Sequence, residues 1–339
     1  MARNLLLLEG MKRPKRTSKT PARKKKPRSR PERRIVNPGD YILCSLEIQQ
    51  RQQLMRPDVL LVRAIIYLFG VYAALHDVQL HAVSVLNSRL QYVLHDRHRN
   101  RVRFREDLHR SLAWVINAFR GRRGAVFSRP KEWPLEGPAA VANAIAHTIA
   151  APVASGSVDK PSEWPGFSTS IADIGGFARR EDRTNIYFGK NSSLPPYSVL
   201  SMHMPTLLLK HQGYRTAILD LKRRVKVAEA TAKLEVAEND WEVMGPKNCL
   251  EVDPMASAPA SISDLTRITP EFATGGNPLA LEANKAMRAT FRADYDRCRQ
   301  RLLAGERDLI WPYGTYAMVE TFGHTIAIPP PPLILAAAA

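Results

Sequence analysis

The feature that most restricts the fold is an apolar run from Val59 to Leu75 that contains one charged residue, Arg63. Pro57 and Asp58 stand just before the run, where a first-turn proline and an acidic residue favour the start of a helix. A helix that is apolar on nearly every face must be covered by other parts of the fold. Because the run is shorter than about 18 residues and holds a charge, we expect a buried helix of a soluble domain, not a membrane span.

Strand-like and helix-like patterns alternate along residues 41–150. Short β-rich runs are separated by turn signals such as Asn87-Ser88-Arg89, and longer runs place apolar residues at helical spacing. The order is strand, helix, hairpin, helix, short strand, helix. This order favours an α+β fold in which a ferredoxin-like antiparallel sheet carries its helices on one face. The expected strands are 41–48, 78–86, 90–94 and part of 124–136, and the expected helices are 59–75, 106 to near 121, and 139–150, the last stopped by Pro152.

Beyond residue 172 the pattern becomes mainly helical. Residues 197–204 favour a strand, whereas residues 214–241 and 280–303 are rich in helix formers. Residues 245–278 are rich in Pro, Ser, Ala and Gly and predict an extended linker. We therefore expect a basic arm at 1–38, a sheet-containing domain at 39–172, a C-terminal extension at 173–325 and a flexible tail at 326–339.

The positive charge of the chain is concentrated in two segments. The formal net charge is +18; residues 12–34 hold 13 lysines and arginines against one acidic residue, and residues 97–123 hold nine arginines against two. The first segment has four prolines and almost no apolar side chains, so it predicts a flexible arm. A polybasic arm binds polyanions because each phosphate contact releases condensed counterions. We expect a nucleic acid as the partner; a solubilising tail or an import signal is the alternative.

The second segment predicts a further contact with nucleic acid. Arginines alternate with other residues from 97 to 105, so an extended backbone would point them to one side as a strip that follows phosphates. The alternative is a solvated loop with two helix ends. The candidate nucleic-acid-binding residues of both segments are Arg23, Lys24, Lys25, Lys26, Arg97, Arg99, Arg101, Arg103, Arg105, Arg120, Arg122 and Arg123.

Several motifs follow one another in order along the chain. They are His76 to Asp96, Asn117, Arg122-Arg123-Gly124-Ala125-Val126-Phe127, Ala151-Pro152-Val153 with Glu163-Trp164-Pro165-Gly166, and Asp308 to Tyr316. This ordered set resembles the REP-associated tyrosine transposases, single-tyrosine HUH transposases of the insertion-sequence type, in which the fourth motif is the "NPV…WPG" segment. The resemblance covers roughly residues 40–322 and is strongest from 76 to 170. It implies a ferredoxin-like sheet that binds single-stranded or hairpin DNA.

The resemblance also implies a chemistry, and this sequence departs from it. In the family, two histidines at i and i+2 of a strand hold a divalent metal while a helix tyrosine attacks the phosphate. Here Arg89 and Gln91 occupy the histidine positions, and the window that we assign to the tyrosine holds Ser111, Leu112 and Ala113. Arginine has no lone pair to donate, and a glutamine oxygen is a weak ligand on its own. We therefore predict no catalytic residue, no metal and no cofactor.

These observations predict a DNA-binding protein of transposase descent that binds single-stranded or hairpin DNA without cleaving it. In this interpretation Arg89 places a fixed positive charge at the phosphate. One alternative is an active transposase or nickase that uses Mg²⁺ or Mn²⁺ and forms a phosphotyrosine. Another is a general RNA-binding protein. His95 and His98 with Asp96 are a further candidate metal site, although i and i+3 is a poor spacing on a strand, and Ser111 is a candidate nucleophile.

The remaining features concern the cellular setting. Three cysteines, Cys44, Cys249 and Cys298, are too few and too scattered for a disulfide framework or a paired zinc knuckle. The leucine run at residues 5–8 is too short for the core of a signal peptide. We expect a cytoplasmic, nucleoid-associated protein that does not bind membranes, and the sequence leaves its oligomeric state open.

Overall fold

The computed structural model describes residues 35–176, 178–185, 187–189, 192–258 and 273–329. These residues belong to one compact unit, which begins at Arg34. Lys24 and the other candidate residues of the basic arm lie outside the described part of the chain, as does most of the expected tail.

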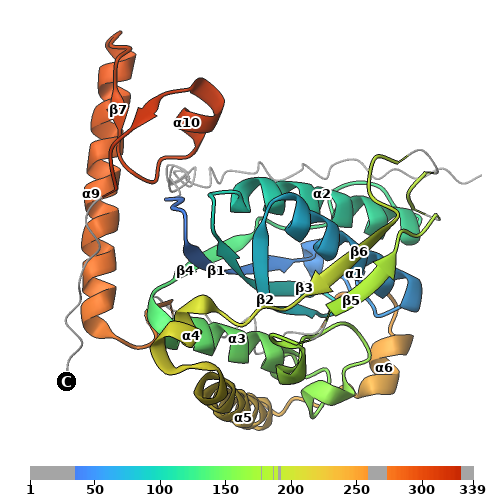
Figure 1. The fold of residues 1–339 in the computed structure, drawn as a ribbon. Helices are drawn as coiled ribbons and strands as arrows, with labels where there is room; N and C mark the ends of the chain where they lie inside the picture. The colour runs from blue at the N-terminus through green and yellow to red at the C-terminus, as the bar shows by residue number, and fades with distance from the viewer. Residues whose placement is uncertain (1–34, 177, 186, 190–191, 259–272, 330–339) are drawn as a thin grey trace, which may run out of the picture. The chain divides into compact units, whose positions relative to one another are not determined.

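A four-stranded antiparallel sheet with the strand order β2-β3-β1-β4 forms the centre (Figure 1). Helix α1 connects β1 to β2, and helix α2 connects β3 to β4. The antiparallel sheet predicted from the sequence is thus confirmed, and so is the helix at 59–75. The bounds are β1 Asp40–Glu47, α1 Val59–Leu75, β2 Val78–Val85, β3 Arg89–Asp96, α2 Arg101–Phe119 and β4 Lys131–Leu135.

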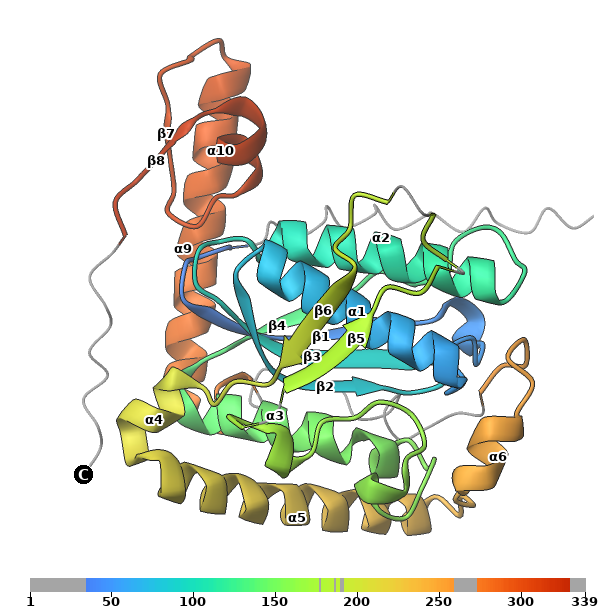
Figure 2. The same ribbon diagram turned by 45° about the vertical axis from the view of Figure 1, so that its right-hand side comes forward.

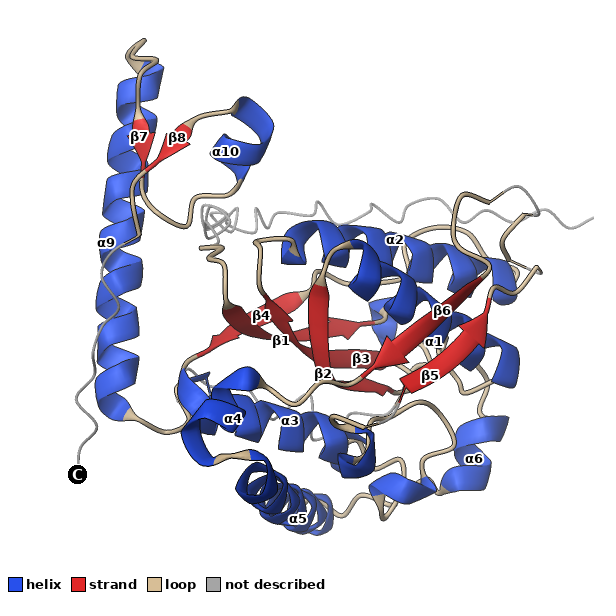
Figure 3. Cartoon of the chain, viewed as in Figure 1, coloured by secondary structure: helices blue, strands red, loops and turns tan. Residues whose placement is uncertain are grey.

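Helices cover both faces of this sheet, so the prediction of helices on one face is wrong. In β1, the even-numbered Ile42 and Leu46 pack with α1 and α2, while the odd-numbered Tyr41 and Leu43 pack with α3 (Gly137–Ala154). Figure 3 shows α1 and α2 on one side of the sheet and α3 on the other. The reason is visible in β1 itself, because an almost continuous apolar run is typical of a strand that is buried on both faces.

Helix α1 is enclosed between the sheet and a separate two-stranded hairpin, β5 (Ala178–Asp182) and β6 (Tyr197–Ser201). Figure 2 shows this hairpin lying across α1. The Ser198 hydroxyl donates a hydrogen bond to the Tyr67 carbonyl at 2.8 Å. A β-carbon added to Gly70 would lie 2.7 Å from the Ser198 oxygen, so only glycine allows this close approach. The apolar run is therefore covered on both sides, as its sequence requires.

The chain beyond residue 172 adds to the same cores. Leu200 packs with α1, and Leu221 of α5 packs with α3. Helix α3 includes Pro152 instead of stopping there, because its burial against the sheet and α5 outweighs one lost hydrogen bond. Part of the expected linker at 245–278 is helical. The remaining bounds are α4 Thr206–Gln212, α5 Tyr214–Glu238, α6 Pro246–Glu251, α9 Pro278–Leu303, β7 Ile310–Trp311, α10 Ala317–Phe322 and β8 Thr325–Ile326, with short 3₁₀ turns at Gln49–Arg51, Pro161–Glu163 and Ile171–Asp173.

Candidate nucleic-acid interface

The arginines that begin at residue 97 do not form an extended strip. β3 ends at Asp96 and α2 begins at Arg101, five residues earlier than the periodicity predicts, so alternate residues no longer share one side. The Asp96 carboxylate accepts hydrogen bonds from the backbone N–H groups of Asn100 (2.8 Å) and Arg101 (3.2 Å). It thereby satisfies donors that the first turn of a helix leaves open, which explains the early start.

Three of the candidate arginines are structural. The Arg101 guanidinium is 3% exposed and donates to the Asp40 carboxylate and to the Ile35 carbonyl. Arg105 pairs with Glu132 at 2.6 Å, and Arg120 pairs with Asp58 at 2.6 Å while also donating to the Leu54 carbonyl at 2.9 Å. These contacts fasten α2 to β1, to β4 and to the loop before α1. Their charge is neutralised inside the fold, so the interpretation of these three as phosphate ligands is corrected.

The other candidates lie nearer the surface. Arg97 and Arg103 form exposed ion pairs with Asp77 and Glu320, both at 2.7 Å. Such pairs contribute little to stability and exchange readily with other anions. Arg123 is exposed. The backbone carbonyls of Val36 and Thr315 accept hydrogen bonds from Arg99, and that of Ala125 accepts one from Arg122.

Arg89 and Gln91 lie side by side on the face of β3 that α3 covers. The Arg89 guanidinium is 7% exposed and donates to the Glu47 carboxylate on the neighbouring strand at 3.0 Å. Gln91 is also buried, and its Oε1 receives no hydrogen bond from the described residues. An arginine that is buried against a carboxylate is not placed to hold a phosphate at the surface, so that interpretation of Arg89 is corrected as well.

The window assigned to the nucleophile lies on the opposite side of the sheet. Leu112 is fully buried between α2 and the sheet, and the Ser111 hydroxyl is hydrogen-bonded to the Tyr72 hydroxyl at 2.6 Å. The helix that faces Arg89 is α3 and not α2, so the residues assigned to the metal ligands and the window assigned to the tyrosine lie on opposite faces of the sheet. Alternation along β3 carries this information, since Leu90 and Tyr92 pack with α2 while Val93 packs with α3.

The sequence analysis missed His147, the single titratable residue of α3. Burial, together with the nearby positive charge of Arg89, lowers the pKa of His147 to about 4. The imidazole is therefore neutral at neutral pH and offers one donor and one acceptor. Because the unfolded chain has the higher pKa, the contribution of His147 to folding falls as the pH drops from about 6.5 toward 4.

The residues at the two histidine positions do not fit a divalent metal. The Arg89 guanidinium only donates hydrogen bonds, and it already neutralises Glu47. The alternative histidines diverge, because His98 contacts Asp77 at 3.0 Å whereas His95 stacks on Tyr41 with ring centroids 4.3 Å apart. Within the described ranges, no three His, Cys, Asp or Glu side chains are grouped to hold a metal ion.

Among the described helices, none combines the length and the apolar character needed to cross a membrane.

Comparison with known proteins gives one distant similarity. No model of a protein family matches the chain, and no curated protein matches it. One solved structure is similar, that of a REP-associated tyrosine transposase bound to a REP hairpin, with a TM-score of 0.36 and 17% identity. The similarity covers 42% of this chain and 82% of that one.

Replacing Arg101 with alanine should lower the free energy of unfolding by about 3 kcal/mol, because Asp40 loses its buried partner. Arg123→Ala should change stability by less than about 0.5 kcal/mol, since the side chain is exposed. Urea denaturation measures both values. If Arg123→Ala weakens binding to a DNA hairpin and reduces the salt slope by about one, Arg123 contacts a phosphate. Equal effects of the two substitutions on stability would contradict the distinction between Arg101 as a structural residue and Arg123 as an exposed one.

Arg89→Gln should raise the pKa of His147 toward its ordinary value, because the substitution removes a nearby positive charge. NMR titration of the imidazole Cε1–H signal measures this change. Arg97→Gln is the matched control, since the Arg97 charge lowers the pKa values of His95 and His203 instead. A His147 titration that is the same in Arg89→Gln and in the unmodified protein would show that the two side chains are not coupled.

Proposed function

We propose that this protein binds DNA, in single-stranded or hairpin form, mainly through its basic arm. The proposal rests on the uneven distribution of carboxylate partners among the basic residues. In the described part of the chain, Arg101, Arg105 and Arg120 are committed to internal carboxylates. The segment 12–34 has 13 basic residues and one acid, so it cannot neutralise itself in this way. In this proposal its excess charge binds phosphates.

The fold that we propose for residues 40–135 is a ferredoxin-like sheet of HUH-transposase descent. The support is the element order β1-α1-β2-β3-α2-β4 together with the strand order β2-β3-β1-β4. The sequence motifs that carry the resemblance are spread over the same region. In this proposal the exposed Arg97, Arg103 and Arg123 also contact the DNA, in addition to the basic residues of the arm.

We further propose that the protein does not cleave the DNA that it binds. The resemblance assigns Arg89 and Gln91 to the positions of the family's metal ligands, and a guanidinium that donates to Glu47 cannot take that role. α3, which faces these two residues, contains no tyrosine. No step of strand transfer is therefore assigned to these residues. A salt-sensitive preference for RNA over DNA hairpins would instead favour a general RNA-binding protein.

Changing Arg23, Lys24, Lys25 and Lys26 together to glutamine should weaken DNA binding and flatten its dependence on salt. If each contacts a phosphate, the slope of log affinity against log salt falls by about three to four units. The measurement is fluorescence anisotropy with a labelled hairpin at several salt concentrations. The matched control changes the same amount of charge at four exposed lysines of the folded part, Lys160, Lys210, Lys226 and Lys247. Equal effects of the two sets would contradict the assignment to the arm.

A further inference from the structure

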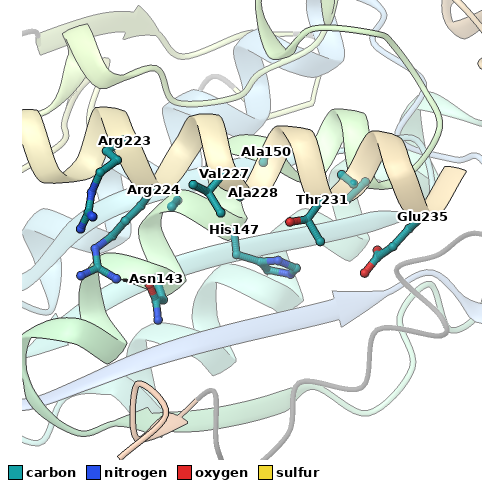
Figure 4. Close-up of a pocket in the computed structure, with 12 residues that line it drawn as sticks. Asn143, His147, Ala150, Arg223, Arg224, Val227, Ala228, Thr231 and Glu235 are labelled. Atoms are coloured by element: carbon teal, nitrogen blue, oxygen red, sulfur yellow. Dashed lines mark hydrogen bonds between the residues drawn. The ribbon is translucent and has the colours of Figure 1, made fainter. Parts of the chain in front are cut away.

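A cavity of about 390 Å³ lies between α3 and α5 (Figure 4). Its walls are small side chains at helical spacing, Ala146 and Ala150 from α3 and Ala228 and Ala232 from α5. Two helices that meet through alanines leave room that larger side chains would fill. The volume falls within the usual range of small-molecule sites.

The two ends of the cavity differ in charge. Arg223 and Arg224 lie at one end and Glu235 lies at the other (Figure 4). At a rise of about 1.5 Å per residue, Glu235 is about 16 Å beyond Arg224 along α5. The Asp220 carboxylate accepts hydrogen bonds from both arginines, from Arg223 at 2.8 Å and from Arg224 at 2.7 Å, and the Asn143 amide oxygen accepts one from Arg224. Two guanidinium groups share one carboxylate and the Arg223 side chain is 73% exposed, so this end keeps a positive charge that an anion can reach. A ligand that suits both ends carries an anionic group at the arginines and a hydrogen-bond donor at the glutamate.

The middle of the cavity is apolar with two polar groups. His147 and Thr231 lie between the charged ends (Figure 4). The neutral imidazole and the hydroxyl each donate and accept, so neither demands a charged partner. The part of the cavity between the arginines and Glu235 therefore suits a planar ring that carries polar atoms on its edge.

We propose that this cavity binds one nucleotide, with its phosphate at Arg223 and Arg224 and the edge of its base at Glu235. The proposal rests on the nucleic-acid binding argued above. Cytosine carries an exocyclic amine that donates to a carboxylate, whereas thymine presents a carbonyl oxygen and a methyl group at the corresponding position. The site should therefore prefer dC to dT. The nucleotide is either free or an unpaired nucleotide of the bound strand.

The first experiment measures the affinity of the full chain for dCMP and dTMP by isothermal titration calorimetry. dCMP should bind about tenfold more tightly than dTMP, as expected for one hydrogen bond to a charged group. Glu235→Gln should remove most of this preference, because an amide can donate as well as accept. Equal affinity for the two nucleotides, or a preference that survives Glu235→Gln, would overturn the proposed orientation.

The second experiment fills the cavity. Ala228→Leu should weaken dCMP binding by about tenfold or more, since the new side chain occupies the slot. Ala230→Leu is the matched control on the same helix, because Ala230 is exposed and does not line the cavity. Circular dichroism checks that both variants fold; if Ala228→Leu does not, the near-isosteric Thr231→Val takes its place. Wild-type affinity in the variant that fills or alters the cavity would overturn the proposal.

Hairpins with one extrahelical dC, with one extrahelical dT, or fully paired distinguish the two sources of the nucleotide. If, among the three hairpins, Ala228→Leu weakens the binding of only the one with extrahelical dC, the cavity holds a nucleotide of the strand. If Ala228→Leu weakens the binding of dCMP but of none of the hairpins, the ligand is a free nucleotide. The protein could bind hairpins through the arm and yet show no preference for dCMP or for the extrahelical dC. That result would refute the proposed nucleotide site in the cavity and leave the proposed function standing. Failure to bind any DNA would refute the proposed function.

Discussion

The burial of β1 and β3 on both faces is the constraint on which the rest of the structure depends. An apolar strand face must be covered, so α1 and α2 pack on one side and α3 on the other. The position of α3 then decides the environment of Arg89 and Gln91, which it covers. It also provides the surface on which α5 packs, and the cavity between α3 and α5 follows from the small side chains along their contact.

The basic residues of the chain fall into two groups, those with carboxylate partners inside the fold and those of the basic arm. Inside the fold, Arg101, Arg105 and Arg120 form short ion pairs that hold α2 against the sheet and the neighbouring loop. Breaking a buried ion pair of this kind leaves an unpaired charge inside the protein. Each pair therefore favours the observed position of α2 over other positions. The arm has one acidic residue, Glu32, for the 13 basic residues of the segment 12–34. Our proposal therefore gives polyanion binding to the arm and to the exposed Arg97, Arg103 and Arg123.

Local patterns predicted the elements, and long-range contacts decided the site. The helix Val59–Leu75 and the hairpin around residues 87–89 follow from periodicity and turn chemistry within a few residues. The roles of the arginines depend on partners far away in sequence: Asp40 lies 61 residues from Arg101, and Asp58 lies 62 from Arg120. His147 was missed because only the fold brings it near Arg89. That Arg89 and Leu112 lie on opposite faces of the sheet could not be predicted, because helices were expected on one face only.

The central claim is that the protein holds a DNA strand without cutting it. The most direct measurement incubates the purified protein with an end-labelled DNA hairpin and Mg²⁺ or Mn²⁺, and compares native with denaturing gels. The account predicts a band shift in the native gel that weakens as salt rises, and uncut, unattached DNA in the denaturing gel. A covalent protein–DNA adduct or a shortened labelled strand would contradict it.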